Sequence, residues 1–518
     1  MFREEKAWMS APHLDRRSFL KAGGSLVVAF GVRVDVAAAA DFTPVPANEL
    51  DSWIAITEDG KVTAFTGRVD IGTGTQTVYC QAIAEELDVP VPSVSVIMGD
   101  TALTPEQGKS TASDSVSLNL KPMRQAAAEA RGVLLDLAAE KLGIPRHQLL
   151  TADGEIFVRG HPDNKVTYGQ LIGGRKFLRE LAIKGQGHLA DIIGKEPLKA
   201  RRDFRVIGKA VQRVDIPAKA RGDFKFVHDV TRDGMVHGAV LLPPAIGARL
   251  VLVEPGEPVP GLIKVVVLEN FVGVVAETEQ AALVARNRIK AVWSTPDGDA
   301  LDDIYDVIRN GTIVKNVSES ETGNVAEALR NAALVVEATF HLPLNCHGMM
   351  GPSCAVADYR GDTLTLWSGT QWPDGTRRDI AAMMGMSAEK VHLIWVEAAG
   401  SYGRLGVDDA AADAALLSRE VARPVRVQWQ RADEHTWSPL NPGAVIAVKA
   451  AAWSRRGSSK IGRLVIPPAR AGICWHGVRL APIRAICASA VRLRRRPTRS
   501  SIKKWSATTL KRSFAAST

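Results

Sequence analysis

The chain has 518 residues, 46% of them hydrophobic, which is enough for about three globular domains with large cores. Its net charge of +9 suggests a nucleic-acid-binding protein, but residues 453–518 carry sixteen Lys and Arg and no Asp or Glu, whereas the rest has 49 basic and 56 acidic residues. A mildly acidic body argues against the basic surface that nucleic-acid binding requires.

The first forty residues have the three parts of a removable export signal. Arg16 and Arg17 precede Ser-Phe-Leu-Lys, and a short apolar run and a group of alanines ending at Ala40 follow. The apolar run is too short to span a bilayer, and paired arginines in this setting are typical of the twin-arginine route. We expect a signal peptide at residues 1–40 and a periplasmic mature protein. A chance arginine pair in an ordinary leader is the alternative.

Strand and helix patterns alternate in the next part of the chain. We expect strands at 53–57, 61–66 and 93–98, a helix after the glycines at 72 and 74, and an alanine-rich helix at 122–142. A polar loop at 99–117 precedes the last helix. Loops of this length inside compact domains tend to be functional, so this loop is a site candidate.

Two further units follow. The first is a separate mixed unit at about 203–293, with strands at 235–242 and 263–268 and a helix at 277–290. The second, at about 335–448, has strands at 363–367, 391–396 and 425–429 and helices at 376–384 and 408–421. This interleaving predicts an α+β or α/β class. The acid pairs 85–86 and 408–409 are expected on helix surfaces or in first turns, without catalytic roles.

Two glycine-rich loops lie between a predicted strand and a predicted helix. Backbone N–H groups and the helix dipole can hold a phosphate at such a place. The loops are Gly72-Thr73-Gly74-Thr75-Gln76 and Gly400-Ser401-Tyr402-Gly403-Arg404. The first lacks the third glycine of a dinucleotide fingerprint, because Thr77 stands there, and a plain turn remains open. One large anionic cofactor held between two domains would use both loops.

Other polar residues allow fewer conclusions. Gln371 follows its own predicted strand, where its amide could bond an oxo group or a substrate carbonyl, although a lone Gln is more often a turn residue. No cysteine pair has the C-x-x-C spacing of a zinc or iron–sulfur site, so any electrons must leave through another subunit. We expect Cys346 and Cys354 to be buried free thiols, with a disulfide as the alternative. The spacing of His341, His347 and Cys346 matches no common zinc pattern, so we assign no metal ligand.

Several motifs, in order, resemble one family. Residues 67–74 (GRVDIGTG), 84–89 (AEELDV) and 98–101 (MGDT) are similar to the molybdopterin-binding large subunits of the xanthine dehydrogenase and aldehyde oxidase superfamily. The exported branch, with the beta subunits of isoquinoline 1-oxidoreductases and the B subunits of nicotinate dehydrogenases, is the most similar. Segments at 207–219 and 234–238 resemble its α/β-hammerhead domain, and 370–371, 400–404 and 423–427 resemble its next segment. The resemblance extends over about 51–449.

The resemblance implies an α+β fold of molybdenum-cofactor-binding domains with an inserted α/β-hammerhead domain. The expected boundaries are 1–40 for the signal, 41–200 for the N-terminal molybdopterin-binding segment, 203–300 for the hammerhead, 301–450 for the first part of a molybdopterin-binding domain, and 451–518 for a basic tail. The implied cofactor is molybdenum-molybdopterin, with a plain pterin or cytosine-dinucleotide tail. The residues implied to hold it are Gly72, Thr73, Gly74, Thr75, Gln76, Ser110, Thr111, Ala112, Ser113, Gln371, Gly400, Ser401, Tyr402, Gly403 and Arg404.

The family's chemistry implies hydroxylation or dehydrogenation of an N-heterocycle or aldehyde, with water as the oxygen source. Electrons would pass to a small [2Fe–2S] partner subunit and then to a cytochrome c-type acceptor. Gln371 matches the glutamine that bonds the apical oxo ligand. The family's glutamate base lies in a Gly-x-Gly-Glu motif that this sequence does not contain, so no catalytic residue is assigned. Gly351 stands where the family usually has Glu, and Tyr402 where Phe is usual.

The basic tail at 451–518 lacks both carboxylates and periodicity. It is either a disordered tail that binds polyanions or the product of a shifted reading frame that begins between Lys449 and Trp453. We favour the frameshift, because selected basic tails are usually poor in Trp and Ile. The chain would then be a truncated, inactive product of a gene of this family, which is the alternative to an active subunit.

Overall fold

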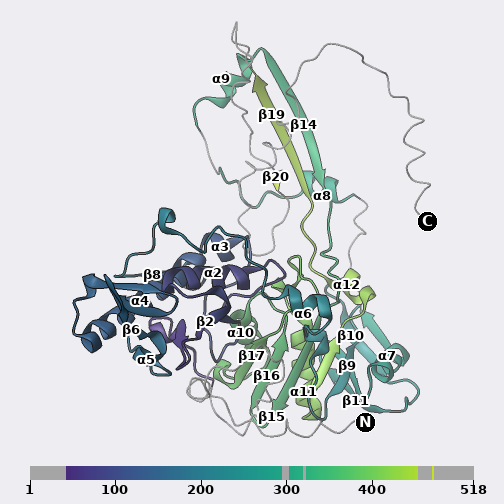
Figure 1. Cartoon of the computed structure of the whole chain (residues 1–518). Coiled ribbons are helices and arrows are strands. Elements are labelled where there is room, and N and C mark those ends of the chain that lie inside the picture. The colour runs from purple at the N-terminus through teal and green to yellow at the C-terminus, as the bar shows by residue number, and fades with distance from the viewer. Residues whose placement is uncertain (1–41, 295–302, 319–321, 453–469, 472–518) are drawn as a thin grey trace, which may run out of the picture. The chain divides into compact units, whose positions relative to one another are not determined.

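The computed structural model describes residues 42–294, 303–318, 322–452 and 470–471 (Figure 1). The predicted signal peptide and nearly all of the basic tail lie outside these ranges, so the structure tests neither prediction. Among the described helices, none is long and apolar enough to cross a membrane.

The N-terminal part is built on a three-stranded sheet with the order β1-β2-β3. β1 (Ile54–Ile56) and β2 (Val62–Thr66) are antiparallel, whereas β3 (Val94–Met98) runs parallel to β2. A parallel neighbour requires a crossover, which helix α2 (Thr75–Leu87) provides. Helix α4 (Leu120–Leu142) packs against α2. The 72–76 loop therefore lies at the point where the chain leaves the sheet for its first crossover helix.

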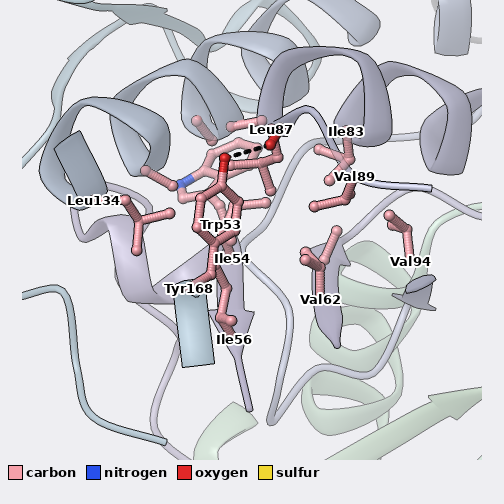
Figure 2. Packing of buried hydrophobic residues seen from close by; sticks show 14 of the residues in the cluster. Trp53, Ile54, Ile56, Val62, Ile83, Leu87, Val89, Val94, Leu134 and Tyr168 are labelled. Carbon is pink, nitrogen blue, oxygen red and sulfur yellow. Dashed lines mark hydrogen bonds between the residues drawn. The ribbon is translucent and has the colours of Figure 1, made fainter. Parts of the chain in front are cut away.

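Apolar side chains of the sheet and helices form the core of this part (Figure 2). Trp53, Ile83 and Leu87 are at most 1% exposed. Tyr168 is also fully buried, and its hydroxyl donates a hydrogen bond of 2.6 Å to the carbonyl oxygen of Leu87. A buried phenol needs such a partner. This core fixes β2 and α2, and with them the two ends of the 72–76 loop.

Smaller elements complete the N-terminal part. One antiparallel sheet has the order β4-β5-β6, and β7 and β8 form a two-stranded sheet. The bounds are α3 (Asp114–Ser117), β4 (Leu149–Ala152), β5 (Glu155–Val158), β6 (His161–Thr167), α5 (Tyr168–Ile172), β7 (Ala182–Lys184) and β8 (Asp191–Ile193).

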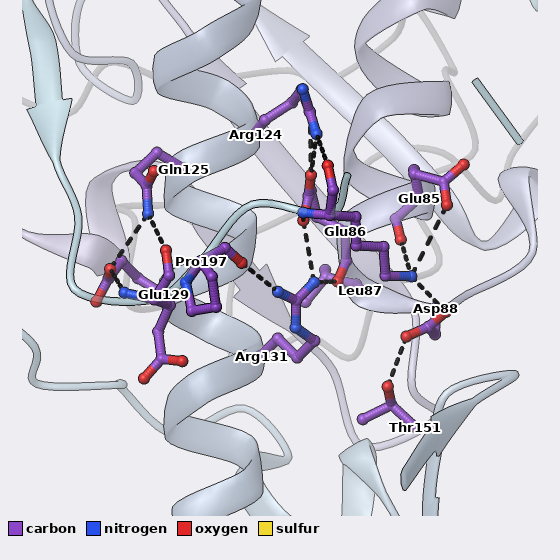
Figure 3. A network of polar contacts seen from close by, with 12 residues as sticks. Glu85, Glu86, Leu87, Asp88, Arg124, Gln125, Glu129, Arg131, Thr151 and Pro197 are labelled. Atoms are coloured by element: carbon purple, nitrogen blue, oxygen red, sulfur yellow. Dashed lines mark hydrogen bonds and ion pairs between the residues drawn. The ribbon is translucent and has the colours of Figure 1, made fainter. Parts of the chain in front are cut away.

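Glu85 and Glu86 of α2 are 1% and 0% exposed, so the prediction that they lie on a helix surface or in a first turn is wrong (Figure 3). The Glu85 carboxylate accepts hydrogen bonds from the backbone N–H groups of residues 205–207. Glu86 accepts hydrogen bonds from Arg124 and Arg131 of α4. Buried carboxylates are tolerated when donors of this kind satisfy them. The pair therefore ties α2 to α4 and to residues 205–207.

A seven-stranded sheet follows, with the order β11-β12-β9-β18-β15-β16-β17. The pairs β9–β18 and β16–β17 are parallel, and the others are antiparallel. The bounds are β9 (Val236–Val240), β11 (Leu262–Leu268), β12 (Phe271–Ala276), β15 (Cys354–Arg360), β16 (Thr363–Ser368), β17 (Val391–Trp395) and β18 (Val425–Gln428). Strands expected in a separate unit at 203–293 thus share a sheet with strands of the next segment. The domain boundaries themselves stay predictions.

Helices cover this sheet. Helix α11 (Asp409–Val421) contacts β15, β16 and β18, and its buried face is mostly alanine, which allows close packing. Asp409 is in the first turn of α11, as predicted, whereas Asp408 lies one residue before the helix and caps it by accepting a hydrogen bond from the N–H of Ala411. Two more helices contact the sheet, α7 (Glu279–Arg288) at β9 and β12 and α10 (Pro373–Met384) at β17. The same part of the chain also contains the short helices α6 (Ile216–Arg221) and α12 (Arg431–Trp437).

Two further sheets complete the described residues: β10 with β13, and β14, β19 and β20. β14 pairs with β19 along its whole length, and β20 adds two residues to β19. The bounds are β10 (Arg249–Glu254), β13 (Lys290–Ser294), α8 (Ile304–Asn310), α9 (Val325–Arg330), β14 (Leu334–Leu342), β19 (Ala444–Ala452) and β20 (Arg470–Ala471). The short 3₁₀ helices are η1 (Leu50–Ser52), η2 (Val91–Ser93), η3 (Arg146–Gln148), η4 (Gly187–Leu189), η5 (Arg201–Asp203), η6 (Val227–Asp229), η7 (Ala388–Lys390) and η8 (Arg404–Gly406).

Three cysteines lie within the described residues, and all three are free thiols. Cys80 and Cys354 are buried, and burial raises the pKa of each thiol to about 12. The prediction is correct for Cys354. For Cys346 the free thiol is correct but the burial is wrong: this residue is exposed in the connection between β14 and β15, with its Sγ 3.8 Å from Nδ1 of His435.

Candidate cofactor-binding site

Gln371 lies between β16 and α10 and is 3% exposed. Its Nε2 donates to the carbonyl oxygen of Ser110 (2.7 Å), and its Oε1 accepts from the hydroxyl of Ser401 (2.8 Å). Its main chain makes two more links, because its carbonyl oxygen accepts from the N–H of Ser110 (2.9 Å) and its N–H donates to the carbonyl oxygen of Leu405 (2.8 Å). Gln371 therefore joins the predicted 110–113 segment and the predicted 400–404 loop.

The 110–113 segment has a buried start and an exposed tip. Ser110 is 3% exposed, and its hydroxyl accepts a hydrogen bond from the N–H of Val69 (3.0 Å). Thr111, Ala112 and Ser113 are exposed, and the last two have φ angles of 50° and 59°. Two successive non-glycine residues in the left-handed region are uncommon and need support from their surroundings. Neighbouring residues must therefore hold the backbone of Ala112 and Ser113 in this conformation.

That support comes from Arg68, a side chain that the sequence analysis did not select. Arg68 is 0% exposed, and its Nη1 donates to the carbonyl oxygen of Lys109 and to Asp114 (3.0 Å). Lys109 in turn donates through Nζ to the carbonyl oxygen of Gly406 (2.8 Å). Residues on both sides of the 110–113 segment are thus anchored. An arginine two residues after an apolar strand was the available signal in the sequence.

The 400–404 loop follows β17 and carries positive φ angles at three places. Gly400 and Gly403 both have φ of 102°, and Tyr402 has φ of 56° and is 65% exposed. Ser401 points inward to Gln371, as described above. Arg404 is 0% exposed and donates to Glu434, Asp409 and the carbonyl oxygen of Val407 (2.9, 2.9 and 2.7 Å). Each guanidinium nitrogen of Arg404 therefore has a protein acceptor.

Residues 347–353 lie against the 400–404 loop. A Cβ atom on Gly403 would lie 3.2 Å from the ring of His347, and one on Gly400 would lie 3.3 Å from the backbone nitrogen of Met350. A Cβ on Gly351 would lie 2.8 Å from His228, so the glutamate that the family usually has at this position does not fit in this arrangement. For this 347–353 segment the resemblance implied only that Gly351 replaces the family's usual Glu.

The backbone N–H groups of the 72–76 loop donate hydrogen bonds to a nearby side chain of the same chain. The N–H groups of Gly72, Gly74 and Gln76 each donate to the carboxylate of Asp70 at 3.0 Å. Asp70 thus takes the position that a phosphate would take at such a loop. Thr73 is exposed and Thr75 is buried with no described partner for its hydroxyl. Contact between this loop and a cofactor stays a prediction.

Charged residues next to that loop form a cluster that the sequence analysis missed. Arg213 donates to Asp215 (2.6 Å) and to the carbonyl oxygen of Gly72 (3.1 Å). Lys219 bridges Asp215 (2.8 Å) and Glu397 (2.6 Å). Burial acts to raise the pKa of Asp215, but hydrogen bonds from Arg213 and Lys219 outweigh it and lower that pKa to about 2. Glu397 precedes the 400–404 loop by three residues, so the cluster links the two glycine-rich loops.

Several buried donors near the 110–113 segment have no partner among the described residues. They are Nε and Nη2 of Arg68 and Nε2 of Gln107, whose Oε1 accepts from Thr66 and from the N–H of Gly67. Arg68 and Gln107 are at most 1% exposed. Unpaired buried donors suit a group rich in acceptors and negative charge, as a pterin with a phosphate tail is. The donors beside the 110–113 segment therefore fit such a cofactor.

Comparisons with known proteins identify related sequences. Two family models, each described as a molybdopterin cofactor-binding domain, match residues 15–216 and 309–458. The B subunit of nicotinate dehydrogenase from Pseudomonas putida is 38% identical over 416 residues, which are 78% of this chain and 34% of that protein. The beta subunit of isoquinoline 1-oxidoreductase from Brevundimonas diminuta is 28% identical over 488 residues, which are 85% of this chain and 62% of that protein.

The chain thus spans about a third of the length of the first relative and less than two thirds of the second. Among solved structures, quinoline 2-oxidoreductase from Pseudomonas putida 86 aligns with 47% of this chain and 37% of that chain, at 19% identity and a TM-score of 0.40. The two matching family models together account for the N-terminal part and for most of the residues that surround Gln371. The chain belongs to the xanthine dehydrogenase and aldehyde oxidase family of molybdopterin-binding proteins.

Proposed function

We propose that this chain is the large subunit of a molybdenum-dependent oxidoreductase that hydroxylates or dehydrogenates an N-heterocycle or an aldehyde. Family membership and the names of the two relatives support the reaction class. The observation that carries the proposal is the convergence of the 110–113 segment and the 400–404 loop on the buried Gln371. These segments come from two distant parts of the sequence and meet at one side chain.

The molybdenum cofactor, when bound, supplies the redox centre for oxygen transfer from water and for electron uptake. The exposed tips at Thr111–Ser113 and Tyr402–Gly403 would hold it through their backbone groups, and Gln371 would orient it from within. We include the cytosine-dinucleotide form in the proposal, beside the plain pterin. The unpaired donors of Arg68 and Gln107 support an anionic group on this side.

Electron transfer requires a partner in this proposal. The sequence has no C-x-x-C pair, so a small [2Fe–2S] subunit would take the electrons and pass them to a cytochrome c-type acceptor. The names of both relatives describe subunits, which supports a multi-subunit enzyme.

We place the enzyme in the periplasm, and the arginine pair at 16–17 supports export by the twin-arginine route. Replacing both arginines with lysine should leave the protein in the cytoplasmic fraction, because the exporting receptor reads the guanidinium pair. Immunoblots of cell fractions measure this. A variant that reaches the periplasm as fully as the wild type would refute the export proposal.

The site itself is tested by cofactor content. Gln371→Ala removes the two side-chain hydrogen bonds that join Ser110 and Ser401, so the purified variant should hold at least about tenfold less pterin and molybdenum than the wild type. Elemental analysis and the fluorescence of oxidised pterin measure the content.

The matched control is Gln148→Ala, which truncates an exposed glutamine and should keep the wild-type content. Both proteins are produced in a host that makes molybdenum cofactor. A wild-type chain with neither pterin nor molybdenum would refute the proposed function. Equal contents in wild type and Gln371→Ala would refute the assigned site.

A further inference from the structure

Glu434 on the short helix α12 is bonded to both loops that meet at the candidate site. It is 5% exposed. Its Oε1 accepts a hydrogen bond from the N–H of Ser353 at the end of the 347–353 segment (2.7 Å). Its Oε2 accepts one from Nε of Arg404 at the end of the 400–404 loop (2.9 Å). One carboxylate thus connects two segments about fifty residues apart in the sequence.

Both bonds are charge-assisted and shielded from water, so each is stronger than a hydrogen bond between neutral groups. Burial acts to raise the pKa of Glu434, but the hydrogen bond from Ser353 and the charge of Arg404 outweigh it and lower that pKa. Glu434 is therefore ionised at neutral pH. Arg404 is 0% exposed, and loss of Glu434 would leave its buried charge to the more exposed carboxylate of Asp409.

The two loops touch closely, which makes their relative placement critical. The N–H of Gly351 donates to the carbonyl oxygen of Ala399 (2.9 Å), and a Cβ on Gly403 would lie 3.2 Å from His347. A second side chain of α12, Arg431, donates to the carbonyl oxygens of residues 349 and 350 (2.7 and 2.8 Å). Helix α12 therefore holds the 347–353 segment at two places and the 400–404 loop at one.

We propose that Glu434 is a positioning residue for the cofactor site: through Ser353 and Arg404 it holds the 347–353 segment and the 400–404 loop in the one arrangement that admits the pterin. The inference rests on the proposed function, because it names a residue that acts on the same site. Glu434 acts through Arg404 and Ser353 and needs no contact with the cofactor.

The test uses the full chain with Glu434→Gln. Glutamine keeps the shape and one acceptor oxygen, but its NH₂ group cannot accept the other hydrogen bond from Ser353 or Arg404, and the negative charge is lost. Amide hydrogen exchange is measured on protein from a host that makes no molybdopterin. Exchange over 347–353 and 400–407 should become at least about tenfold faster, while residues 54–87 keep the wild-type rate. A second readout is the pterin retained when the proteins are produced with cofactor, which should fall by a similar factor.

The matched control is Asp433→Asn on the same helix. Asp433 pairs with Arg286 (2.8 Å), outside both loops, and the Asn can still accept the capping hydrogen bond from the N–H of Gln430. This variant should keep the wild-type exchange over both loops and the wild-type pterin content. If Glu434→Gln does not fold, as judged by circular dichroism, Arg404→Lys decides by the same readouts. Arg404→Lys keeps the positive charge but loses the several N–H donors of the guanidinium group, so amide exchange over 400–407 should become faster.

Four results overturn the inference. Wild-type exchange in both loops of the folded variant shows that Glu434 does not hold them. Amide exchange that becomes equally faster along the whole chain shows that Glu434 stabilises the fold in general and does not position the two loops. Wild-type pterin retention in Glu434→Gln overturns the positioning role and leaves the proposed function standing. A wild-type chain that retains no pterin overturns the proposed function, and the inference falls with it.

Discussion

Arg68 and Arg404 are completely buried, and each is paired with a carboxylate. Arg68 is bonded to Asp114 and Arg404 to Glu434, at 3.0 and 2.9 Å. Removing a charge from water costs several kcal/mol per ion, and good geometry with further hydrogen bonds must offset it. Burial lowers the pKa of Arg68 below its ordinary value, although the charge of Asp114 opposes this. Both arginines thus serve to fix loops of the candidate site.

Asp413 of α11 is a half-buried residue whose carboxyl has a testable pH dependence. Burial raises its pKa to about 7, helped by the charges of Asp409, Asp408 and Asp433 and opposed by the hydrogen bond from Trp429. The folded state keeps this proton up to about pH 7, whereas the unfolded chain loses it near 3.8, so stability falls as pH rises through this window. Asp413→Asn should therefore be more stable than the wild type at pH 8, with a difference that fades toward pH 4.

Thermal unfolding at several pH values measures this difference, with about 2–4 °C expected for each kcal/mol relieved. Asp379→Asn is the matched control, because it makes the same change on the exposed side of α10 and should shift little. An Asp413→Asn protein no more stable than the wild type at pH 8 would contradict the assignment.

At the scale of elements, α2 and α4 are joined by polar contacts as well as by the apolar core (Figure 3). Glu86 on α2 receives hydrogen bonds from Arg124 and Arg131, which lie two turns apart on one face of α4. α2 begins directly after Gly74, so the clamp also fixes one end of the 72–76 loop. A polar clamp of this kind sets the register between two helices that apolar contacts alone would specify less sharply.

Glu86→Ala should lower the free energy of unfolding by about 3–5 kcal/mol, because it leaves two arginines without their buried partner. Glu140→Ala on the exposed face of α4 should change it by no more than about 0.5 kcal/mol. Urea unfolding followed by circular dichroism gives both values. A loss below about 1 kcal/mol for Glu86→Ala would show that the pair contributes little.

At the scale of the whole molecule, the N-terminal part joins the seven-stranded sheet at residues 99–101. The N–H of Trp395 donates to the carbonyl oxygen of Gly99 (3.2 Å), and the N–H of Thr101 donates to that of Leu393 (2.9 Å). The side chain of Asp100 lies 2.7 Å from Nε2 of His392. The 99–117 loop starts at this junction, so its placement next to Gln371 depends on it.

Gly99→Ala tests the junction. Gly99 has φ of 64°, and an added Cβ would lie 2.7 Å from both Val69 and Trp395, so backbone strain and a clash combine to cost about 2–4 kcal/mol. Gly60→Ala is the matched control, because Gly60 has φ of 79° and nothing within 4 Å of the added atom. Only the strain, about 1–2 kcal/mol, should remain there. Equal losses of unfolding free energy in the two variants would show that the junction is not tightly packed.

Local patterns were enough to predict many elements. The strands expected at 61–66, 93–98, 363–367 and 391–396 and the helices expected at 122–142 and 408–421 are confirmed within a few residues. Apolar periodicity and glycine at the ends carry this information within each segment. β14 and β19 were not predicted, because a ribbon with most of β14 exposed has little of the apolar and polar alternation that marks a half-buried strand.

The sequence by itself determined the family, through motifs at 67–74, 98–101 and 400–404, and it indicated Gln371 and both segments that bond to it. Only the tertiary structure decided which polar groups meet. Gln371 bonds Ser110 across 261 residues, Asp70 takes the donors of the 72–76 loop, and Glu434 joins two loops. Such pairings depend on how distant elements pack, and local periodicity holds no information about that.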